Sequence, residues 1–214
     1  MSRAFRLGIT GKIGSGKSTL SEVARTQGIR VLESDVIAKE VMSTDPKIRS
    51  AIESLFGPEA YSGGLLNRPF LASKIFTDAT LRIQLEKIVH PATQEVYEAE
   101  FRKGKPGEII VLESALLFQT GLDEIFDALI LVEAKDEAVI GREEESRKLS
   151  REDVSNRLKL QHYDNEWKED ADFMIANDGG KEDFIRRCES LIRLVKIVAS
   201  QELPDLPLRM IIEK

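Results

Sequence analysis

The stretch Gly11-Lys12-Ile13-Gly14-Ser15-Gly16-Lys17-Ser18 decides the fold. It follows the short apolar run Leu7-Gly8-Ile9-Thr10 and precedes a segment with helical spacing that starts near Lys17. The octad matches Gly-x-x-x-x-Gly-Lys-Ser/Thr in full, and this pattern binds phosphate when a strand precedes it and a helix follows. The sequence therefore predicts a nucleotide-binding loop between a strand and a helix.

Each residue type in the octad has a physical reason to be there. Glycines allow backbone angles and close approaches that a Cβ would block, so successive N–H groups can turn inward around a phosphate. The following helix adds its positive N-terminal end. Lys17 is expected to contact the β and γ phosphates, and the Ser18 hydroxyl to bind Mg²⁺. Thr19 either donates to an α phosphate or is an ordinary first-turn residue, and the bound nucleotide is ATP or GTP.

Outside the octad, short apolar runs alternate with longer segments of helical spacing. This alternation is typical of an α/β protein whose parallel sheet is covered on both faces. Ligands of such sheets bind beyond the carboxyl ends of the strands. The runs that predict strands are Leu7–Thr10, Ile29–Leu32, Glu108–Leu112, Ala128–Val132 and Phe173–Ala176.

Two helical stretches interrupt the alternation. Residues 46–101 contain a turn at Ser62-Gly63-Gly64 and then Asn67, which is placed to cap a helix. Residues 136–162 form two charged helical pieces. We interpret 46–101 as an insertion that binds the acceptor and 136–162 as a lid, although either stretch also fits a solvated helical hairpin. A single domain would span residues 1–200, and the tail 201–214 gives no clear signal.

Composition excludes several classes of protein. The chain has 214 residues, of which 42% are hydrophobic and 32% charged, as in ordinary globular domains. A net charge of −6 argues against nucleic-acid binding. The sequence has neither an apolar run long enough for a membrane span nor a signal peptide, so we expect a soluble, cytoplasmic protein. Cys188 is the only cysteine, which excludes an intramolecular disulfide and a cysteine-based zinc site.

The remaining motifs indicate which kind of nucleotide-binding protein this is. The chain has neither the Asn-Lys-x-Asp and Asp-x-x-Gly strings of GTPases nor the Leu-Ser-Gly-Gly-Gln signature of transporter ATPases. A kinase acting on a small acceptor needs a carboxylate near the acceptor hydroxyl, an acid near the metal and cations that close over the phosphates. We therefore look for these three features.

Two carboxylates follow predicted strands. Asp35 comes directly after the second strand, where it either accepts the proton of an attacking alcohol or caps a helix that begins at Val36. Glu113 ends the run Ile109–Leu112, where it either holds Mg²⁺ through water or is a strand-end carboxylate without a metal role.

Cations gather in the predicted lid of this otherwise acidic protein. An arginine that approaches phosphate as water leaves gains about fourfold in Coulomb energy over one in bulk water. The same cations can instead pair with Glu143, Glu144 and Glu145 on a solvated face. The cations of the predicted lid are Arg142, Arg147, Lys148, Arg151, Arg157 and Lys159.

Together these features resemble the dephospho-coenzyme A kinases, which phosphorylate the ribose 3′-hydroxyl of dephospho-CoA. The resemblance runs from Leu7 to about Gly179 and begins with the phosphate-loop octad. It continues in Ser34–Ala38, Gly64–Arg68, His90-Pro91, Glu113–Phe118, Arg157–Gln161 and Ala171–Asn177, which keep the order and spacing of the family's motifs.

The resemblance implies a fold and a set of roles. The fold would be a P-loop kinase-type three-layer α/β fold with a parallel five-stranded core sheet, a helical substrate-binding insertion and a helical lid. The substrates would be ATP and dephospho-CoA, with Mg²⁺, in a monomer or weak homo-oligomer that binds neither nucleic acid nor membrane. Asp35 would be the acceptor base, Asn177 would lie near adenine, and Arg142 and Arg147 would join Lys17 in catalysis. Thr10, Arg68, His90 and Leu116 would lie near the acceptor, although His90-Pro91 also fits the end of a turn between helices.

Several positions depart from the family's pattern. Glu33 replaces the first aspartate of the Asp-Ala-Asp motif, and Ala115 and Gln119 replace the usual proline and acid of the Leu-Leu-Phe motif. The second lid arginine falls on Ser146, with Arg147 beside it. Two further hypotheses therefore stay open: a kinase for another small molecule such as a nucleoside or a shikimate-like acceptor, and a nucleotide-binding regulatory module whose altered lid has lost catalysis.

Overall fold

A computed structural model gives the structure of residues 2–118, 121, 123–147, 150–160, 167–200 and 210–212. Only the backbone is described at 123, 145–147, 153, 156, 157, 159, 160 and 210–212. The chain forms two compact units. The first contains the residues up to Leu32 together with those from Gly104 onward, and the second contains Glu33–Lys103.

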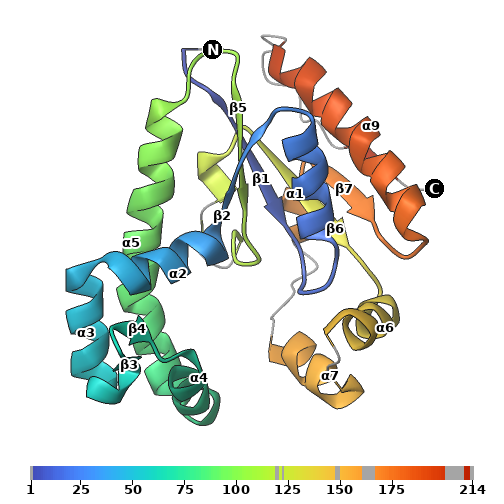
Figure 1. Ribbon diagram of the computed structural model, residues 1–214. Coiled ribbons are helices and arrows are strands. Elements are labelled where there is room, and N and C mark those ends of the chain that lie inside the picture. Colours follow the sequence, from blue (N-terminus) through green and yellow to red (C-terminus); the bar gives the residue numbers. More distant parts are fainter. Residues whose placement is uncertain are drawn as a thin grey trace. The chain divides into compact units, whose positions relative to one another are not determined.

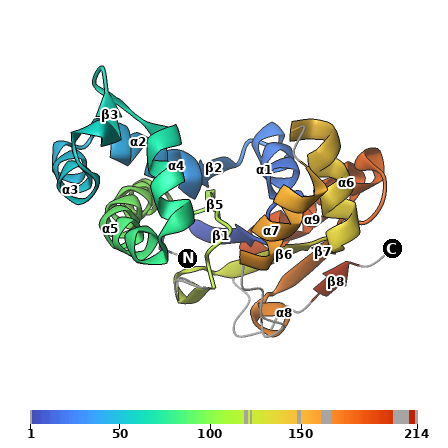
Figure 2. The same cartoon turned by 90° about the horizontal axis from the view of Figure 1, so that it is seen from below.

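The central sheet has six strands in the order β2-β5-β1-β6-β7-β8. Figure 1 labels all of them except β8, which is labelled in Figure 2. The pairs β1–β5, β1–β6, β6–β7 and β7–β8 are parallel, and Leu7 of β1 lies opposite Val111 on one side and Ala128 on the other. The strands are β1 (Phe5–Thr10), β2 (Arg30–Glu33), β5 (Ile109–Glu113), β6 (Ala128–Glu133), β7 (Phe173–Ala176) and β8 (Met210–Ile212). The five predicted strands are confirmed. The sixth strand, β8, lies at one edge of the sheet, and the sequence did not indicate it.

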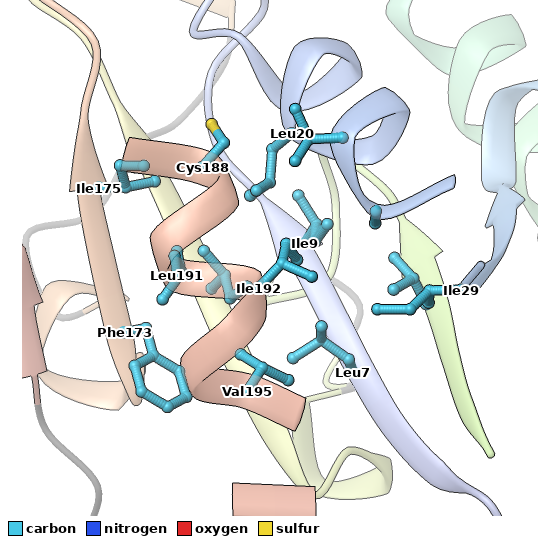
Figure 3. Packing of buried hydrophobic residues seen from close by; sticks show 14 of the residues in the cluster. Leu7, Ile9, Leu20, Ile29, Phe173, Ile175, Cys188, Leu191, Ile192 and Val195 are labelled. Carbon is cyan, nitrogen blue, oxygen red and sulfur yellow. The ribbon is translucent and has the colours of Figure 1, made fainter. Parts of the chain in front are cut away.

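Two helices cover one face of this sheet, side by side (Figure 3). They are α1 (Lys17–Thr26), which starts where the octad predicts, and α9 (Lys181–Ser200). Leu7 and Ile9 of β1 pack into the core under them. Because side chains alternate along a strand, Gly8 faces the opposite side. A Cβ on Gly8 would meet Leu117 and Leu129 there.

Cys188 of α9 lies within this core, with its side chain fully buried (Figure 3). Burial raises the pKa of its thiol to about 12, because a thiolate would lose its hydration there. The sulfur is a packing atom of the core.

The second unit is mainly helical. Its apolar core contains Ile52, Ala60, Tyr61, Leu71 and Val89. Its elements are α2 (Ser34–Thr44), α3 (Pro46–Phe56), the 3-10 turn η1 (Pro58–Ala60), β3 (Tyr61–Ser62), β4 (Leu65–Leu66), α4 (Arg68–Thr77) and α5 (Ala79–Lys103). The unit contains the whole predicted insertion 46–101 and begins earlier, at Glu33.

Local signals in this unit are confirmed. The Asn67 side chain accepts from the Phe70 N–H at 3.3 Å and caps α4, with Pro69 in the first turn. The turn at Ser62-Gly63-Gly64 joins β3 to the antiparallel strand β4. The turn at Ser62-Gly63-Gly64 thus reverses the chain, and Asn67 starts the next helix.

Two of the alternative interpretations are wrong. Helix α2 begins at Ser34, and Glu33 occupies its N-cap position, so Asp35 lies inside the first turn and does not cap the helix. Helix α5 runs unbroken through Pro91, so His90-Pro91 does not end a turn between helices. Proline removes one backbone donor, but α5 packs against α2, α3 and α4, and these contacts support the long helix.

The predicted lid is two packed helices, α6 (Asp136–Arg147) and α7 (Arg151–Leu160), which lie side by side in both views (Figure 1, Figure 2). Val139, Ile140, Val154 and Leu158 form their shared apolar cluster, and Ile13 of the phosphate loop packs against it. The 3-10 turn η2 (Asp123–Ile125) and the short helix α8 (Trp167–Asp170) complete the first unit. Across the described residues, every helix is too short or too polar to cross a membrane.

Candidate active site

The phosphate loop lies between Thr10, the last residue of β1, and Lys17, the first residue of α1. The Lys17 Nζ donates to the carbonyl oxygens of Gly11 at 2.8 Å and Lys12 at 2.9 Å. The ammonium group is therefore held inside the curve of the loop. A triphosphate bound there would meet this charge together with the N-terminal end of α1.

Gly16 shows why the loop requires glycine. Its φ of 111° lies in the left-handed region. A Cβ at this position would collide with the Asn177 amide nitrogen and would lie 2.9 Å from the Phe184 ring. The backbone thus approaches the residues after β7 more closely than a side chain would allow.

Asn177 fixes the loop from the sheet edge. Its side-chain Nδ2 donates to the Ser15 carbonyl at 2.8 Å, and its backbone N–H donates to the Glu133 carbonyl at 2.8 Å. The side chain is only 6% exposed. The sequence prediction placed Asn177 near adenine, and the structure adds a direct bond to the phosphate loop.

A cavity of about 840 Å³ opens beside the loop. Its size falls within the range of about 300–1,000 Å³ that is usual for small-molecule sites. The lining comes from the loop and the start of α1, from α6, and from the segment after β7 with the start of α9. It includes Gly14, Gly16, Lys17, Ser18, Thr19, Arg142, Glu143, Asn177, Asp178 and Lys181.

Arg142 of α6 reaches this cavity. Its Nη1 donates to the Asn177 carbonyl at 2.7 Å and its Nη2 to the Gly14 carbonyl at 3.3 Å. Burial lowers the pKa of the guanidinium, and the negative charges of Asp178 and Glu143 act in the opposite direction. Of the predicted lid cations, this one is placed against the phosphate loop.

The other lid cations differ from Arg142. Arg151 is exposed and pairs with Glu137 of α6 at 2.6 Å, so in this structure it braces the two lid helices. The side chains of Arg147, Arg157 and Lys159, and the whole of Lys148, lie outside the described residues. Their predicted roles remain predictions.

Ser18 and Glu113 come together from two elements. The Ser18 hydroxyl donates to Oε1 of Glu113 at 3.5 Å, between the start of α1 and the end of β5. A hydroxyl and a carboxylate are oxygen ligands of the kind Mg²⁺ prefers, and Mg²⁺ usually binds one or two of them with phosphate oxygens and water. Within the described part of the chain, no group of three or more His, Cys, Asp or Glu is arranged to hold a metal. This pair therefore fits a magnesium that is shared with a nucleotide.

Two loop residues have side chains occupied elsewhere. The Lys12 Nζ pairs with Asp136 of α6 at 3.0 Å, and Ile13 packs against the lid cluster. In this structure both side chains tie the phosphate loop to the lid. Their contribution to a bound phosphate would come from the backbone N–H groups.

The residues predicted near the acceptor fall into both units. Thr10 and Leu116 belong to the first unit, where Thr10 is fully buried and Leu116 is partly buried. Asp35, Arg68 and His90 are exposed residues of the second unit, on α2, α4 and α5 respectively. Each exposed side chain is available to a ligand.

Several contacts at the site were not predicted. Glu143 is buried against the loop, and Phe184 of α9 lies behind Gly16. Trp167 stacks on Phe118 with ring centroids 5.4 Å apart. All three contacts join segments that are distant in sequence, so no local pattern predicts them.

Comparisons with known proteins agree on one family. A family model described as dephospho-CoA kinase matches residues 5–183. A dephospho-CoA kinase of Bacteroides fragilis is 37% identical over 178 residues, covering 83% of this chain and 87% of that protein. Another from Chlorobaculum tepidum is 35% identical over 182 residues, covering 81% and 86%.

Solved structures give the same result for the fold. The crystal structure of TT1252 from Thermus thermophilus superimposes with a TM-score of 0.76 at 32% identity, covering 90% of this chain and 98% of that one. A dephospho-CoA kinase from Campylobacter jejuni gives a TM-score of 0.68 at 24% identity, covering 90% and 98%, and at that identity supports the fold alone.

Proposed function

Because this chain belongs to the dephospho-CoA kinase family, its reaction is the ATP-dependent phosphorylation of dephospho-CoA, and we propose how its residues divide that work. The products are coenzyme A and ADP. The observation that carries the proposal is the loop with Lys17 held inside its curve, opening into the large cavity between the loop and α6.

The phosphate loop binds the triphosphate of ATP. Backbone N–H groups from Gly11 to Thr19 surround the phosphates, and Lys17 contacts the β and γ phosphates. Replacing its two carbonyl partners with phosphate oxygens needs only a small movement of the flexible ammonium arm. Asn177 holds the Ser15 carbonyl, so the loop keeps its shape while the ligand exchanges.

Ser18 and Glu113 would hold the magnesium ion of the nucleotide complex. When bound there, Mg²⁺ would neutralise negative charge that develops on the phosphates during transfer. The Ser18 hydroxyl and Glu113 Oε1 are 3.5 Å apart, so both oxygens lie near one point.

Asp35 accepts the proton of the ribose 3′-hydroxyl. The hydroxyl oxygen forms a bond to the γ-phosphorus, the bond from that phosphorus to the β–γ bridging oxygen breaks, and ADP leaves with the electron pair. Asp35 is exposed and follows the end of β2 by two residues, which suits a base that meets a ligand at the carboxyl edge of a sheet. The proton then passes from the carboxylate to solvent.

Arg142 and the acceptor residues position the two substrates. Arg142 stabilises the negative charge of the transferring group, aided by Arg147 of the same helix. Arg68 and His90 contact the acceptor, and Thr10 and Leu116 shape its pocket. We place this reaction in the cytoplasm, which suits a protein whose one cysteine is a buried free thiol.

A coupled assay of ADP release tests the proposal. Dephospho-CoA should support turnover that depends on Mg²⁺, whereas adenosine, shikimate and gluconate at equal concentration should not exceed the background ATPase rate. Mass spectrometry of the product should show one added phosphoryl group on the ribose of dephospho-CoA. Strong turnover with another alcohol and none with dephospho-CoA would contradict the proposal, as would ATP binding without any phosphorylated product.

A further inference from the structure

Glu143 presents a buried negative charge at the phosphate loop. Its side chain is 6% exposed, and it is the one charged residue among the buried polar residues that the structure describes. Its Cγ and Oε1 both lie 3.2 Å from the point where a Cβ on Gly14 would stand. A carboxylate is therefore packed directly against the loop that receives phosphate.

The lid helix α6 holds this carboxylate in place. Val139, one turn earlier on the same face, also packs on Gly14 and belongs to the apolar cluster of the lid. Arg142, the preceding residue, bonds to the Gly14 and Asn177 carbonyls. Glu143 could not move away from the loop without disturbing these contacts of Val139 and Arg142. The packing of α6 on the loop therefore holds Glu143 in place.

Glu143 shares its cavity with the phosphate-binding groups. The cavity lining includes Lys17, Ser18 and Glu143. The inward N–H groups of the loop and the start of α1 create a positive potential there, which favours any anion. The Glu143 carboxylate and the phosphates of a nucleotide are therefore stabilised by the same positive potential.

We propose that Glu143 is a specificity-determining residue of the nucleotide site, which weakens nucleotide binding more strongly the more phosphates the ligand carries. The proposal rests on the proposed function, since it assumes that ATP occupies this cavity. Its consequence for turnover is that the site holds ATP and ADP less tightly than the loop and its cations alone would, which speeds release of the product ADP.

The direction of the effect is the same for two positions of the side chain. If Glu143 stays against the loop when nucleotide binds, it repels each phosphate at short range in a partly buried site. If the lid carries it away, the protein gives up the favourable interaction between the carboxylate and the loop before phosphate enters. Removing the charge strengthens phosphate binding in both situations.

The chain offers a matched control. Glu144 is the next residue of α6, carries the same charge and is exposed to solvent, where charges are well screened. Asp178, another acid of the cavity, already accepts from the Lys135 backbone N–H at 2.7 Å and forms an ion pair with its side chain. Glu143→Gln and Glu144→Gln therefore remove the same charge from a buried and an exposed position of one helix.

Calorimetric titration with adenosine, AMP, ADP and ATP, in the presence and absence of Mg²⁺, tests the proposal. Glu143→Gln should bind ATP on the order of tenfold more tightly than the wild type, equal to about 1.4 kcal/mol. The gain should shrink through ADP and AMP and vanish for adenosine. Glu144→Gln should match the wild type for all four ligands. Glu143→Leu, which suits the apolar lid surface, should repeat the pattern and keeps the test valid if the glutamine variant folds poorly.

Other outcomes would overturn the inference in distinguishable ways. Equal changes for all four ligands would mean that Glu143 acts by shaping the cavity, and an ATP affinity that falls in Glu143→Gln would mean that the carboxylate assists binding, for example through Mg²⁺. Either result would leave the proposed function standing. A wild-type protein that binds none of the phosphorylated nucleotides would overturn the nucleotide site itself.

Discussion

Gly16 of the phosphate loop is under two independent constraints, its left-handed backbone and its two close neighbours. Asn177 and Phe184 occupy the space where a Cβ on Gly16 would stand. Asn177 in turn donates a hydrogen bond to the Ser15 carbonyl. A change at this one position therefore affects the shape of the loop and the residue that anchors it.

The substitution Gly16→Ala should cost both stability and nucleotide binding. Positive φ alone costs a non-glycine residue roughly 1–2 kcal/mol, and displacement of Asn177 adds to this cost. Gly28→Ala is the control, since Gly28 has a φ of 79° but nothing within 4 Å of its Cβ position. Urea unfolding should show a modest loss for Gly28→Ala and a larger one for Gly16→Ala, which alone should lose ATP binding by titration. Equal losses with ATP binding intact would show that Asn177 does not hold the loop in this way.

The substitution Asp35→Asn separates proton transfer from nucleotide binding. An amide keeps the shape of the side chain but cannot accept the hydroxyl proton, and general-base catalysis typically contributes about 10²–10⁴ in rate. We expect the turnover of dephospho-CoA to fall by that factor while the affinity for ATP stays within about twofold. Unchanged turnover in the coupled assay would remove Asp35 from the mechanism.

At the scale of elements, α9 is a structural helix that carries an ionisable group into the core. Leu191, Ile192 and Val195 pack around the Cys188 turn and against β1 and β7. The thiol is neutral in the folded chain, with its pKa raised to about 12 by burial. The unfolded chain exposes the same thiol, which then ionises near its ordinary pKa of about 8.5.

This difference predicts an alkaline loss of stability. The folded-state pKa lies above the unfolded one, so the contribution is fully present below about pH 8.5. Above that pH the unfolded chain releases the proton first, and the free energy of unfolding falls by about 1.4 kcal/mol per pH unit. Urea unfolding from about pH 8 to pH 10 should show this fall for the wild type relative to Cys188→Ala. Parallel curves for the two proteins, or rapid reaction of the native thiol with a thiol reagent, would contradict the buried position.

Elements with a local sequence signal could be predicted, and elements that depend on tertiary contacts could not. The five main strands and α1 were recognisable because each has a continuous apolar run or a local motif, and the Asn67 cap because capping is a local hydrogen bond. The strand β8 has three residues and joins the sheet only by pairing with β7, so its sequence carries little signal. Pro91 suggested a break in the helix, and the tertiary contacts of α5 outweighed that local preference.

Candidate site residues could be proposed only where the sequence carries a motif. The octad, Glu113 and Arg142 were proposed in this way, and the structure brings Ser18 to Glu113 and Arg142 to Gly14. The burial of Glu143 and the bond from Asn177 to Ser15 arise from segments more than a hundred residues from the loop. Such contacts depend on how whole elements pack, and no spacing within one segment encodes them.

At the scale of the whole molecule, the residues with proposed roles fall in both compact units. Those proposed to bind the nucleotide belong to the first unit, and the proposed base Asp35, with Arg68 and His90, belongs to the second.

A crystal structure with Mg²⁺, a non-hydrolysable ATP analogue and dephospho-CoA would show whether the proposed residues meet the reacting atoms. We expect the triphosphate within the loop from Gly11 to Ser18, the metal beside Ser18 and Glu113, and the ribose 3′-hydroxyl within hydrogen-bond distance of Asp35 and in line with the γ-phosphorus. A triphosphate bound away from the loop, or a ribose hydroxyl remote from Asp35, would contradict this expectation.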